Sequence, residues 1–170
     1  LADPVICDPL TRSMCCPVGD ASAAAVLVSG DMLDKIKRDK SRMPIKVLGC
    51  AAQSGGYASA TGLTCDPSEN VGRTSQMAYE QAGLGPKDMD VVEIHDAFAI
   101  AELIVAEALG FAEKGEGARL IEEGKSNFDG DIAINPSGGL LSRGHPVGAT
   151  GLLQTVEIVN QLRGEATGCQ

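Results

Sequence analysis

The chain has 170 residues, of which 44% are hydrophobic and only 3% aromatic, so a buried core is feasible and must be mainly aliphatic. Its formal net charge of −9 argues against non-specific binding to nucleic acid or to an anionic membrane, since both need clustered positive charge. The sequence holds no apolar run long enough for a transmembrane helix, and no signal peptide opens it. We therefore expect no nucleic-acid partner and no membrane partner.

The six cysteines lack the paired C-x-x-C spacing of a zinc site. Unpaired thiols are typical of a reducing compartment, so we expect a cytoplasmic protein. For a eukaryotic protein, the alternative is a peroxisomal or mitochondrial location.

Residues 1–20 are rich in turn-forming residues. The patterns that follow them predict a strand, a helix and a second strand. Residues 23–29 form a compact apolar run that is typical of a buried strand. An amphipathic pattern from Gly30 to about Ser41 predicts a helix. Residues 45–52 are a second apolar run and predict the second strand.

A polar, glycine-containing stretch at residues 53–70 predicts a boundary between two parts. We therefore divide the chain into residues 1–60 and residues 61–170. In the second part, the patterns predict helices over 70–82, 97–109, 117–123 and 147–162, and strands over 90–94 and 132–134. Strands that alternate with helices predict an α/β fold, with helices packed on a sheet.

The two histidines of the chain occupy equivalent positions, each on a turn that leads from a strand to a helix. His95 ends the strand 90–94 and precedes a helix that is apolar on every side and therefore expected to be buried. His145 lies in a loop that contains five glycines: Gly138, Gly139, Gly144, Gly148 and Gly151. Ligands of open α/β sheets bind outside the carboxyl ends of the strands, so the pair predicts a functional site; the alternative is two structural histidines.

Other kinds of site fit these segments less well. The loop 144–151 has no lysine before a serine or threonine, as a P-loop needs, and the chain has no G-x-S-x-G nucleophile turn. His95 and Asp96 are neighbours on a turn, which points their side chains apart, so we expect no metal site. Two imidazoles can donate hydrogen bonds to an oxygen that becomes anionic, and the glycines leave room for a thioester arm. The pattern therefore favours enolate or thioester chemistry.

Two segments resemble motifs of the thiolase family. The histidine version of the family's N-E-A-F or H-D-A-F block is similar to Glu93-Ile-His-Asp-Ala-Phe-Ala99. The family's G-H-P-x-G-A-[ST]-G block is similar to residues 144–151, which follow Asn135-Pro-Ser-Gly-Gly139. Residues 20–25 and 83–90 also resemble family segments. The resemblance is closest to the H-D-x-F group, which comprises the sterol-carrier-protein-type and archaeal acetyl-CoA acetyltransferases.

The resemblance implies an acyl-CoA C-acyltransferase with a layered α-β-α-β-α fold, a homodimer or homotetramer in its complete form. Because the chain begins at Leu1 and stops soon after a predicted helix, we expect a fold that is truncated at both ends. Residues 1–60 are then the end of the N-terminal thiolase half, and residues 61–170 are the C-terminal thiolase domain without its last strands. The implied reaction is Claisen condensation, or thiolytic cleavage of a 3-oxoacyl-CoA, through a nucleophilic cysteine. Acyl-CoA and CoA are then substrates, and no further cofactor is expected.

The resemblance also implies roles for individual residues. His145 matches the histidine that activates the nucleophilic cysteine and donates to the thioester oxygen. His95 matches the histidine that completes the oxyanion hole, directly or through water. Phe98 matches an aromatic residue that lines the acyl and pantetheine channel, with ordinary packing as the alternative. Gly144 and Pro146, on either side of His145, are expected to contact the substrate.

The chain departs from the family pattern at its cysteines. None of the six cysteines has the setting of the nucleophile, and Ala97 stands where H-D-C-F members carry an acid/base cysteine. Cys169 follows the last predicted helix and is expected to be incidental. The chain should therefore be inactive alone. Because the last strands of its C-terminal half are expected to be missing, it should also expose a sheet edge. The alternatives are a non-catalytic thiolase-fold partner subunit of an acyl-CoA enzyme complex, and a related condensing enzyme of the ketoacyl synthase or hydroxymethylglutaryl-CoA synthase type.

Overall fold

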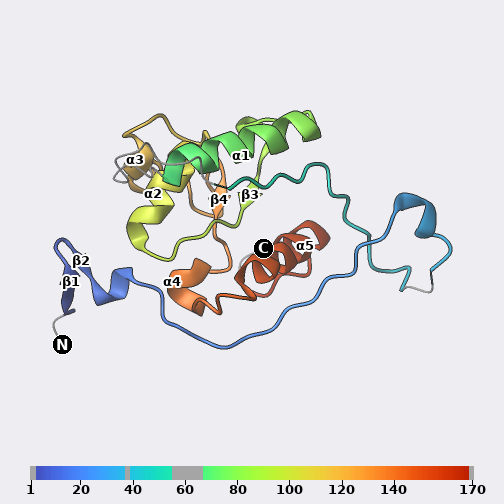
Figure 1. Ribbon diagram of the computed structural model, residues 1–170, viewed down its shortest axis with the longest axis horizontal. Coiled ribbons are helices and arrows are strands. Elements are labelled where there is room, and N and C mark those ends of the chain that lie inside the picture. The colour runs from blue at the N-terminus through green and yellow to red at the C-terminus, as the bar shows by residue number, and fades with distance from the viewer. Residues whose placement is uncertain (1–2, 37–38, 55–66, 169–170) are drawn as a thin grey trace.

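A computed structural model describes residues 3–36, 39–54 and 67–168 of the chain (Figure 1). The described residues form short strands and helices, which is a mixed α/β architecture, as the sequence predicts. In chain order they are β1 (Val5–Cys7), β2 (Leu10–Thr11), η1 (Arg12–Met14), η2 (Gly30–Met32), α1 (Pro67–Ala82), η3 (Pro86–Asp88), β3 (Val91–Val92), α2 (Ala99–Ala108), α3 (Gly117–Glu122), β4 (Ala133–Ile134), α4 (Gly139–Arg143) and α5 (Thr150–Arg163).

The strands β3 and β4 organise the C-terminal part of the chain. They pair in parallel, with Val91 opposite Ala133 and Val92 opposite Ile134. Helix α1 lies above the two strands in Figure 1, and α4 and α5 lie below them. The buried hydrophobic side chains gather around this centre: Ile94, Ala106, Leu120, Ile132 and Leu140. Both carboxyl ends of the strands therefore open toward the same edge, and each leads toward a histidine.

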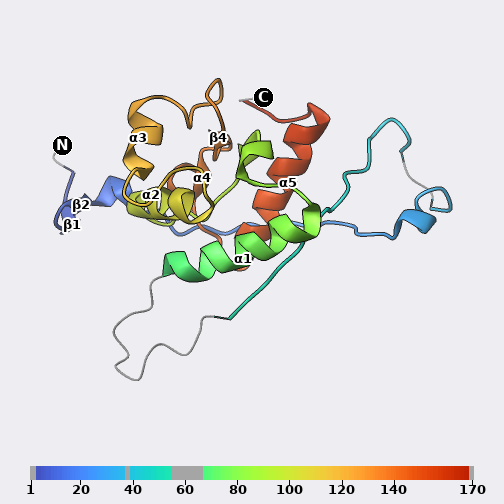
Figure 2. The ribbon, with the colours of Figure 1, turned by 90° about the horizontal axis from the view of Figure 1, so that it is seen from above.

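The helices of the C-terminal part confirm the sequence patterns, with ends that glycine explains. Helix α1 ends at Ala82 and α5 at Arg163, and each is followed by a glycine with positive φ, Gly83 at 68° and Gly164 at 67°. This left-handed conformation ends a helix at little cost for glycine. Figure 2 shows α1 and α5 as the two long helices of the molecule.

Helix α2 is less buried than its apolar sequence predicts. Only Ala106 of its ten residues is buried, and Ile100 is 44% exposed. The helix packs on α1 and α3 through part of its surface. The expectation of a helix buried on every side is therefore wrong for the described residues, because no other described element covers its outer face.

The two strands predicted in the first part of the chain do not form. Residues 23–29 and 45–52 belong to no strand in the structure, and Val26 and Leu27 are 90% and 78% exposed. The helix predicted from Gly30 is reduced to the single turn η2. A buried strand needs a neighbouring strand, and the described residues supply none for these segments. Residues 45–52 run beside α1 instead, where the Cys50 N–H donates to Oε1 of Gln81 at 2.9 Å.

Some of the remaining predictions fall outside the described residues. The boundary near residue 60 and most of the predicted loop 53–70 lie within the unplaced range 55–66, while α1 begins at Pro67 inside that predicted loop. The sequence also missed α4 and the antiparallel pair β1–β2. Across the described ranges, every helix is either too short or too polar to cross a membrane.

A glycine at position 139 is required where the chain enters α4. Gly139 has φ +62°, and a Cβ there would clash with the Asp96 carboxylate and lie 2.8 Å from Nδ2 of Asn135. We expect Gly139→Ala to lower the free energy of unfolding by about 2–4 kcal/mol in denaturant titrations, from backbone strain and overpacking together. Gly148→Ala is the matched control, because a Cβ at Gly148 meets nothing within 4 Å. Equal losses in the two variants would contradict this account.

Candidate functional site

The two histidines lie together, as their equivalent positions predict. The ring centroids of His95 and His145 are 4.7 Å apart, and the ring planes meet at 86°, which is an edge-to-face arrangement. His95 follows β3, and His145 follows α4, which itself follows β4. The parallel pairing of the two strands thus delivers one imidazole from each strand to a single point.

A third segment, which the sequence did not predict, pairs with both histidine segments. The Cys16 N–H donates to the Ala97 carbonyl at 2.9 Å, and the His145 N–H donates to the Pro17 carbonyl at 2.8 Å. Isolated bridges also pair Cys15 with Phe98 and Val18 with His145. Residues 15–18 therefore hold the backbones of the two segments together from the outside. The sequence did not predict this extended stretch because Pro17 and Gly19 favour turns.

A hydrogen bond to Thr150 determines which nitrogen of His145 carries the proton. Nδ1 of His145 is 2.8 Å from Oγ1 of Thr150, and that hydroxyl also donates to the Pro146 carbonyl at 3.0 Å. A hydroxyl has one proton to donate, and here it donates that proton to the Pro146 carbonyl. Toward His145 the Thr150 hydroxyl can therefore only accept, so Nδ1 carries the proton and donates it. Thr150 is only 4% exposed, which keeps this arrangement away from water. We therefore assign the neutral ring a free lone pair on Nε2, where it can accept a proton.

His95 is held in its neutral form by its surroundings. Burial lowers the pKa of His95, the neighbouring His145 lowers it further, and Asp96 opposes both effects. His95 is partly exposed, but a charged imidazole there would still lose some solvation and would lie beside a second ring. At neutral pH His95 therefore presents an uncharged ring, which can donate one hydrogen bond.

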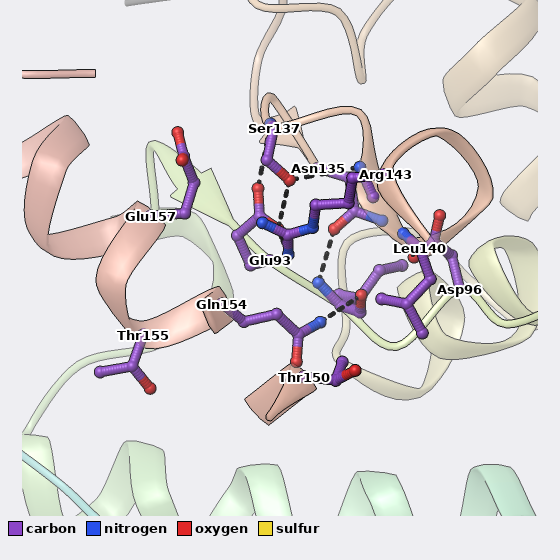
Figure 3. A network of polar contacts seen from close by, with 12 residues as sticks. Glu93, Asp96, Asn135, Ser137, Leu140, Arg143, Thr150, Gln154, Thr155 and Glu157 are labelled. Carbon is purple, nitrogen blue, oxygen red and sulfur yellow. Dashed lines mark hydrogen bonds and ion pairs between the residues drawn. The ribbon is translucent and has the colours of Figure 1, made fainter. Parts of the chain in front are cut away.

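Asp96 binds the N-terminal turn of helix α4. Its side chain is 2% exposed, and its carboxylate accepts from the Leu140 N–H at 2.7 Å and from the Leu141 N–H at 3.4 Å (Figure 3). A carboxylate at a helix N-terminus satisfies free N–H groups of the first turn. His95 and Asp96 thus point to different partners, as predicted. The described residues contain no group of three or more histidine, cysteine or acidic side chains that could hold a metal ion.

Two amide side chains, which the sequence analysis missed, hold the backbone just before His95. Oδ1 of Asn135 accepts from the Ile94 N–H at 2.7 Å, and Nε2 of Gln154 donates to the Ile94 carbonyl at 2.6 Å (Figure 3). Asn135 itself has a positive φ of 49°, a conformation that asparagine tolerates better than most residues. In the sequence, the signal for this support was the place of Asn135 at the start of the Asn135-Pro-Ser-Gly-Gly139 segment, which the motif includes.

The three predicted substrate-contacting residues surround the histidine pair in different ways. Phe98 is 50% exposed and pairs with Cys15, so ordinary burial does not explain it within the described residues. Gly144 is buried with φ +91°, which favours glycine. Pro146 is half-buried and borders a hollow of about 410 Å³ that residues 19–23 close from the other side. A larger hollow of about 700 Å³, beside α3, is lined by neither histidine.

No cysteine in the described part of the chain has a hydrogen bond with either histidine ring. Cys7 and Cys50 are exposed free thiols, and Cys15 and Cys16 are half-buried. The Cys15 thiol donates to the Thr11 carbonyl at 3.5 Å. Cys65 and Cys169 lie outside the described residues.

The lowered pKa of His95 can be measured by NMR titration of its ring. We expect a midpoint below the ordinary histidine value of about 6.5. His145→Gln should raise the midpoint only part of the way, because burial is the larger cause. Between pH 6.5 and the lowered pKa, the unfolded chain binds more protons than the folded one, so the His95 contribution to stability falls as the pH falls through this window. A midpoint at or above 6.5 would contradict the assigned environment.

The assigned tautomer of His145 can be tested at Thr150. In Thr150→Val the hydroxyl acceptor is lost, and we expect ring-nitrogen NMR signals of His145 to show a mixture of tautomers. Thr150→Ser keeps the hydroxyl and should preserve the single tautomer of the parent protein. If valine leaves those signals unchanged, the hydrogen bond does not determine the tautomer.

Comparisons with known proteins agree with the motifs and the fold. The family model described as thiolase C-terminal domain-like matches residues 43–170. An acetyl-CoA acetyltransferase of Methanothermobacter thermautotrophicus is 43% identical over 162 residues, which cover 95% of this chain and 41% of the relative. The benzoylsuccinyl-CoA thiolase subunit BbsB of Thauera aromatica is 39% identical, over 98% of this chain and 42% of the relative. Sterol carrier protein 2 of Homo sapiens is 40% identical, over 98% of this chain and 30% of the relative.

A solved structure has the same fold. The Ltp2-ChsH2(DUF35) aldolase matches with a TM-score of 0.77 and 25% identity, over 96% of this chain and 42% of that chain. The chain thus spans less than half the length of these relatives. With its two histidine motifs, its α/β architecture and a family model that covers most of its length, the chain belongs to the thiolase family.

Proposed function

We propose that the protein is a thiolase-type acyl-CoA C-acyltransferase and that this chain supplies its oxyanion-hole histidines. The observation that carries the proposal is the edge-to-face pair of imidazoles on the segments that follow two parallel strands. One ring has a hydrogen-bonded Nδ1 and a free Nε2, and the other is kept neutral. The substrates proposed are acyl-CoA and CoA, and no further cofactor takes part.

The pair divides the proton chemistry of thiolysis between two residues. Nε2 of His145 accepts the proton of a cysteine thiol, and the resulting thiolate attacks the 3-keto carbon of a 3-oxoacyl-CoA. As the bond between C2 and C3 breaks, the acyl group stays on sulfur, and the electron pair passes to the thioester as an enolate. A neutral His95 and a protonated His145 can both donate hydrogen bonds to the oxygen that becomes negative. The enolate then takes up a proton, and CoA removes the acyl group.

Three further residues are proposed to shape the substrate path. Phe98 offers an exposed aromatic face beside His95, and Gly144 and Pro146 keep the approach to His145 narrow and free of long side chains. The nucleophilic cysteine is proposed to come from a part of the protein outside this chain. The complete protein is proposed to be a homodimer or homotetramer in the cytoplasm.

A second candidate function is that of a non-catalytic partner in an acyl-CoA enzyme complex. The names of two similar proteins favour it: one is a thiolase subunit, and the other is an Ltp2-ChsH2(DUF35) aldolase. Mass spectrometry of the full-length protein after exposure to acetyl-CoA separates the two candidates. An acetyl group on a cysteine supports the transferase, and its absence under conditions that label a reference thiolase supports the partner.

The transferase is tested most directly by His145→Ala in the full-length protein. We expect thiolysis of acetoacetyl-CoA to fall by about 100-fold or more, since a single acid–base or oxyanion group contributes that much. Lys125→Gln is the control, because Lys125 forms an exposed ion pair with Glu123, beside α3. Retention of more than about a tenth of the rate in His145→Ala would contradict the proposed role.

A further inference from the structure

We infer that Glu93 is a positioning residue for the histidine pair, because its buried carboxylate ties the His95 segment to both ends of helix α4. Its effect on activity rests on the proposed function, whereas its effect on the histidine rings does not. Neither the histidine motifs nor the family resemblance assigns Glu93 a role in the site.

The contacts of Glu93 are made by one side chain in two directions. The Ser137 hydroxyl donates to Oε2 at 2.7 Å, and the Ser137 N–H donates to Oε1 at 3.1 Å. Nη2 of Arg143 forms an ion pair with Oε2 at 3.0 Å. Figure 3 shows Glu93 between these two partners. The Glu93 side chain is 1% exposed and that of Arg143 is 25% exposed, so water screens this pair little.

The contacts of Glu93 with Ser137 and Arg143 are called the Glu93 clamp below. Where these residues stand in the chain explains how the clamp sets the positions of the two histidine rings. Glu93 stands two residues before His95, and Arg143 stands two residues before His145. Ser137 precedes α4, and Arg143 is its last residue. A helix of five residues cannot hold its own shape, so its direction depends on what binds its ends. Glu93 therefore links the two histidine segments by binding both ends of α4.

Asp96 completes the arrangement from the other side of His95. Its carboxylate binds the first N–H groups of α4, while Glu93 binds Ser137 and Arg143. His95 thus lies on a stretch whose two flanking carboxylates both bind the α4 region. A shift of α4 relative to this stretch would change the separation of the two rings. Catalysis by paired donors depends steeply on such a separation, because a misplacement of about 1 Å can cost 10²-fold.

A buried carboxylate is an unfavourable way to obtain stability alone. Burial raises the pKa of Glu93, the Ser137 hydrogen bonds and Arg143 lower it, and Glu157 on α5 raises it again. An apolar pair of similar volume often stabilises a fold as well as a buried ion pair does. What the carboxylate adds is a defined orientation of α4 relative to the His95 segment. Two hydrogen bonds from Ser137 and one from Arg143 fix this orientation from the two ends of α4.

The experiment compares Glu93→Gln with Glu157→Gln in the full-length protein. Glutamine keeps the shape of Glu93 and removes its charge, so the ion pair with Arg143 is lost. Glu157 faces the same region and accepts from Gln161 at 3.1 Å, a contact that a glutamine oxygen can keep. Thiolysis of acetoacetyl-CoA gives kcat and KM, and ring-nitrogen NMR reports the tautomer of His145 and the pKa of His95.

We expect Glu93→Gln to lower kcat by about 10- to 100-fold with little change in KM, and to alter the ring signals of both histidines. Glu157→Gln should leave all of these near the values of the parent protein. Adding Arg143→Gln to Glu93→Gln should lower kcat no further, because the two residues act through one contact. If Glu93→Gln does not fold, Ser137→Ala removes the hydroxyl that donates to Glu93 and accepts from the Gly139 N–H, and it should still lower kcat and alter the ring signals.

Two outcomes would overturn the inference. Ring signals and kcat that stay unchanged in a folded Glu93→Gln or Ser137→Ala variant would show that the clamp does not position the pair. A loss of kcat that equals the loss of folded protein, with unchanged ring signals, would show a structural role only. If the parent protein does not thiolyse acetoacetyl-CoA, the proposed function fails, and the ring signals alone then decide whether Glu93 positions the histidines.

Discussion

The parallel pairing of two very short strands is the constraint on which the site depends. Strands β3 and β4 are each two residues long, and their ladder is continued by the Ala133 N–H on the Asp90 carbonyl at 2.9 Å and the Asn135 N–H on the Val92 carbonyl at 2.8 Å. Because the strands are parallel, both chains leave the ladder at the same edge. A slip of one residue in this register would turn the strand side chains to opposite faces and would shift the segments that carry the two histidines relative to each other.

Beyond the ladder, polar side chains replace the missing length of strand. Asn135 and Gln154 bind the two sides of the Ile94 peptide group, and the carboxylates of Glu93 and Asp96 bind the α4 region. Each of these groups is largely shielded from water, where a hydrogen bond with good geometry limits movement more strongly than apolar contact does. The site is therefore a network of polar contacts around the two imidazoles, and of these four supports only Gln154, on α5, belongs to a helix or strand.

The sequence predicted most of the C-terminal part of the fold and little of the N-terminal part. Helices such as α1 and α5 carry both an apolar face and a glycine stop, so their local patterns suffice. Residues 23–29 and 45–52 carry the apolar pattern of strands, but whether they pair depends on neighbours that a local pattern does not contain. Exposed Val26 and Leu27 show the result.

In the candidate site, the sequence predicted the two histidines and missed the residues that support them. Histidine is rare in this chain, so two examples at equivalent turns were conspicuous. Glu93 and Gln154 look like ordinary polar residues of a strand end and a helix, and only the tertiary structure shows that they bind Ser137 and the Ile94 carbonyl. A contact between residues far apart in sequence leaves no periodic signal, which is why such supports escape a reading of one chain.

The unequal support of the two histidines agrees with unequal roles. The His145 ring is anchored through Nδ1 by a buried hydroxyl, which leaves one nitrogen to exchange a proton in a fixed direction. Within the described residues, the His95 ring has no such anchor; it has a backbone held on both sides of Ile94 and a lowered pKa. A base must present its lone pair in one direction, whereas a donor to an oxyanion needs a neutral ring that can turn toward its acceptor. We therefore propose His145 as the proton acceptor and His95 as the adjustable donor, although both arise from the same kind of turn.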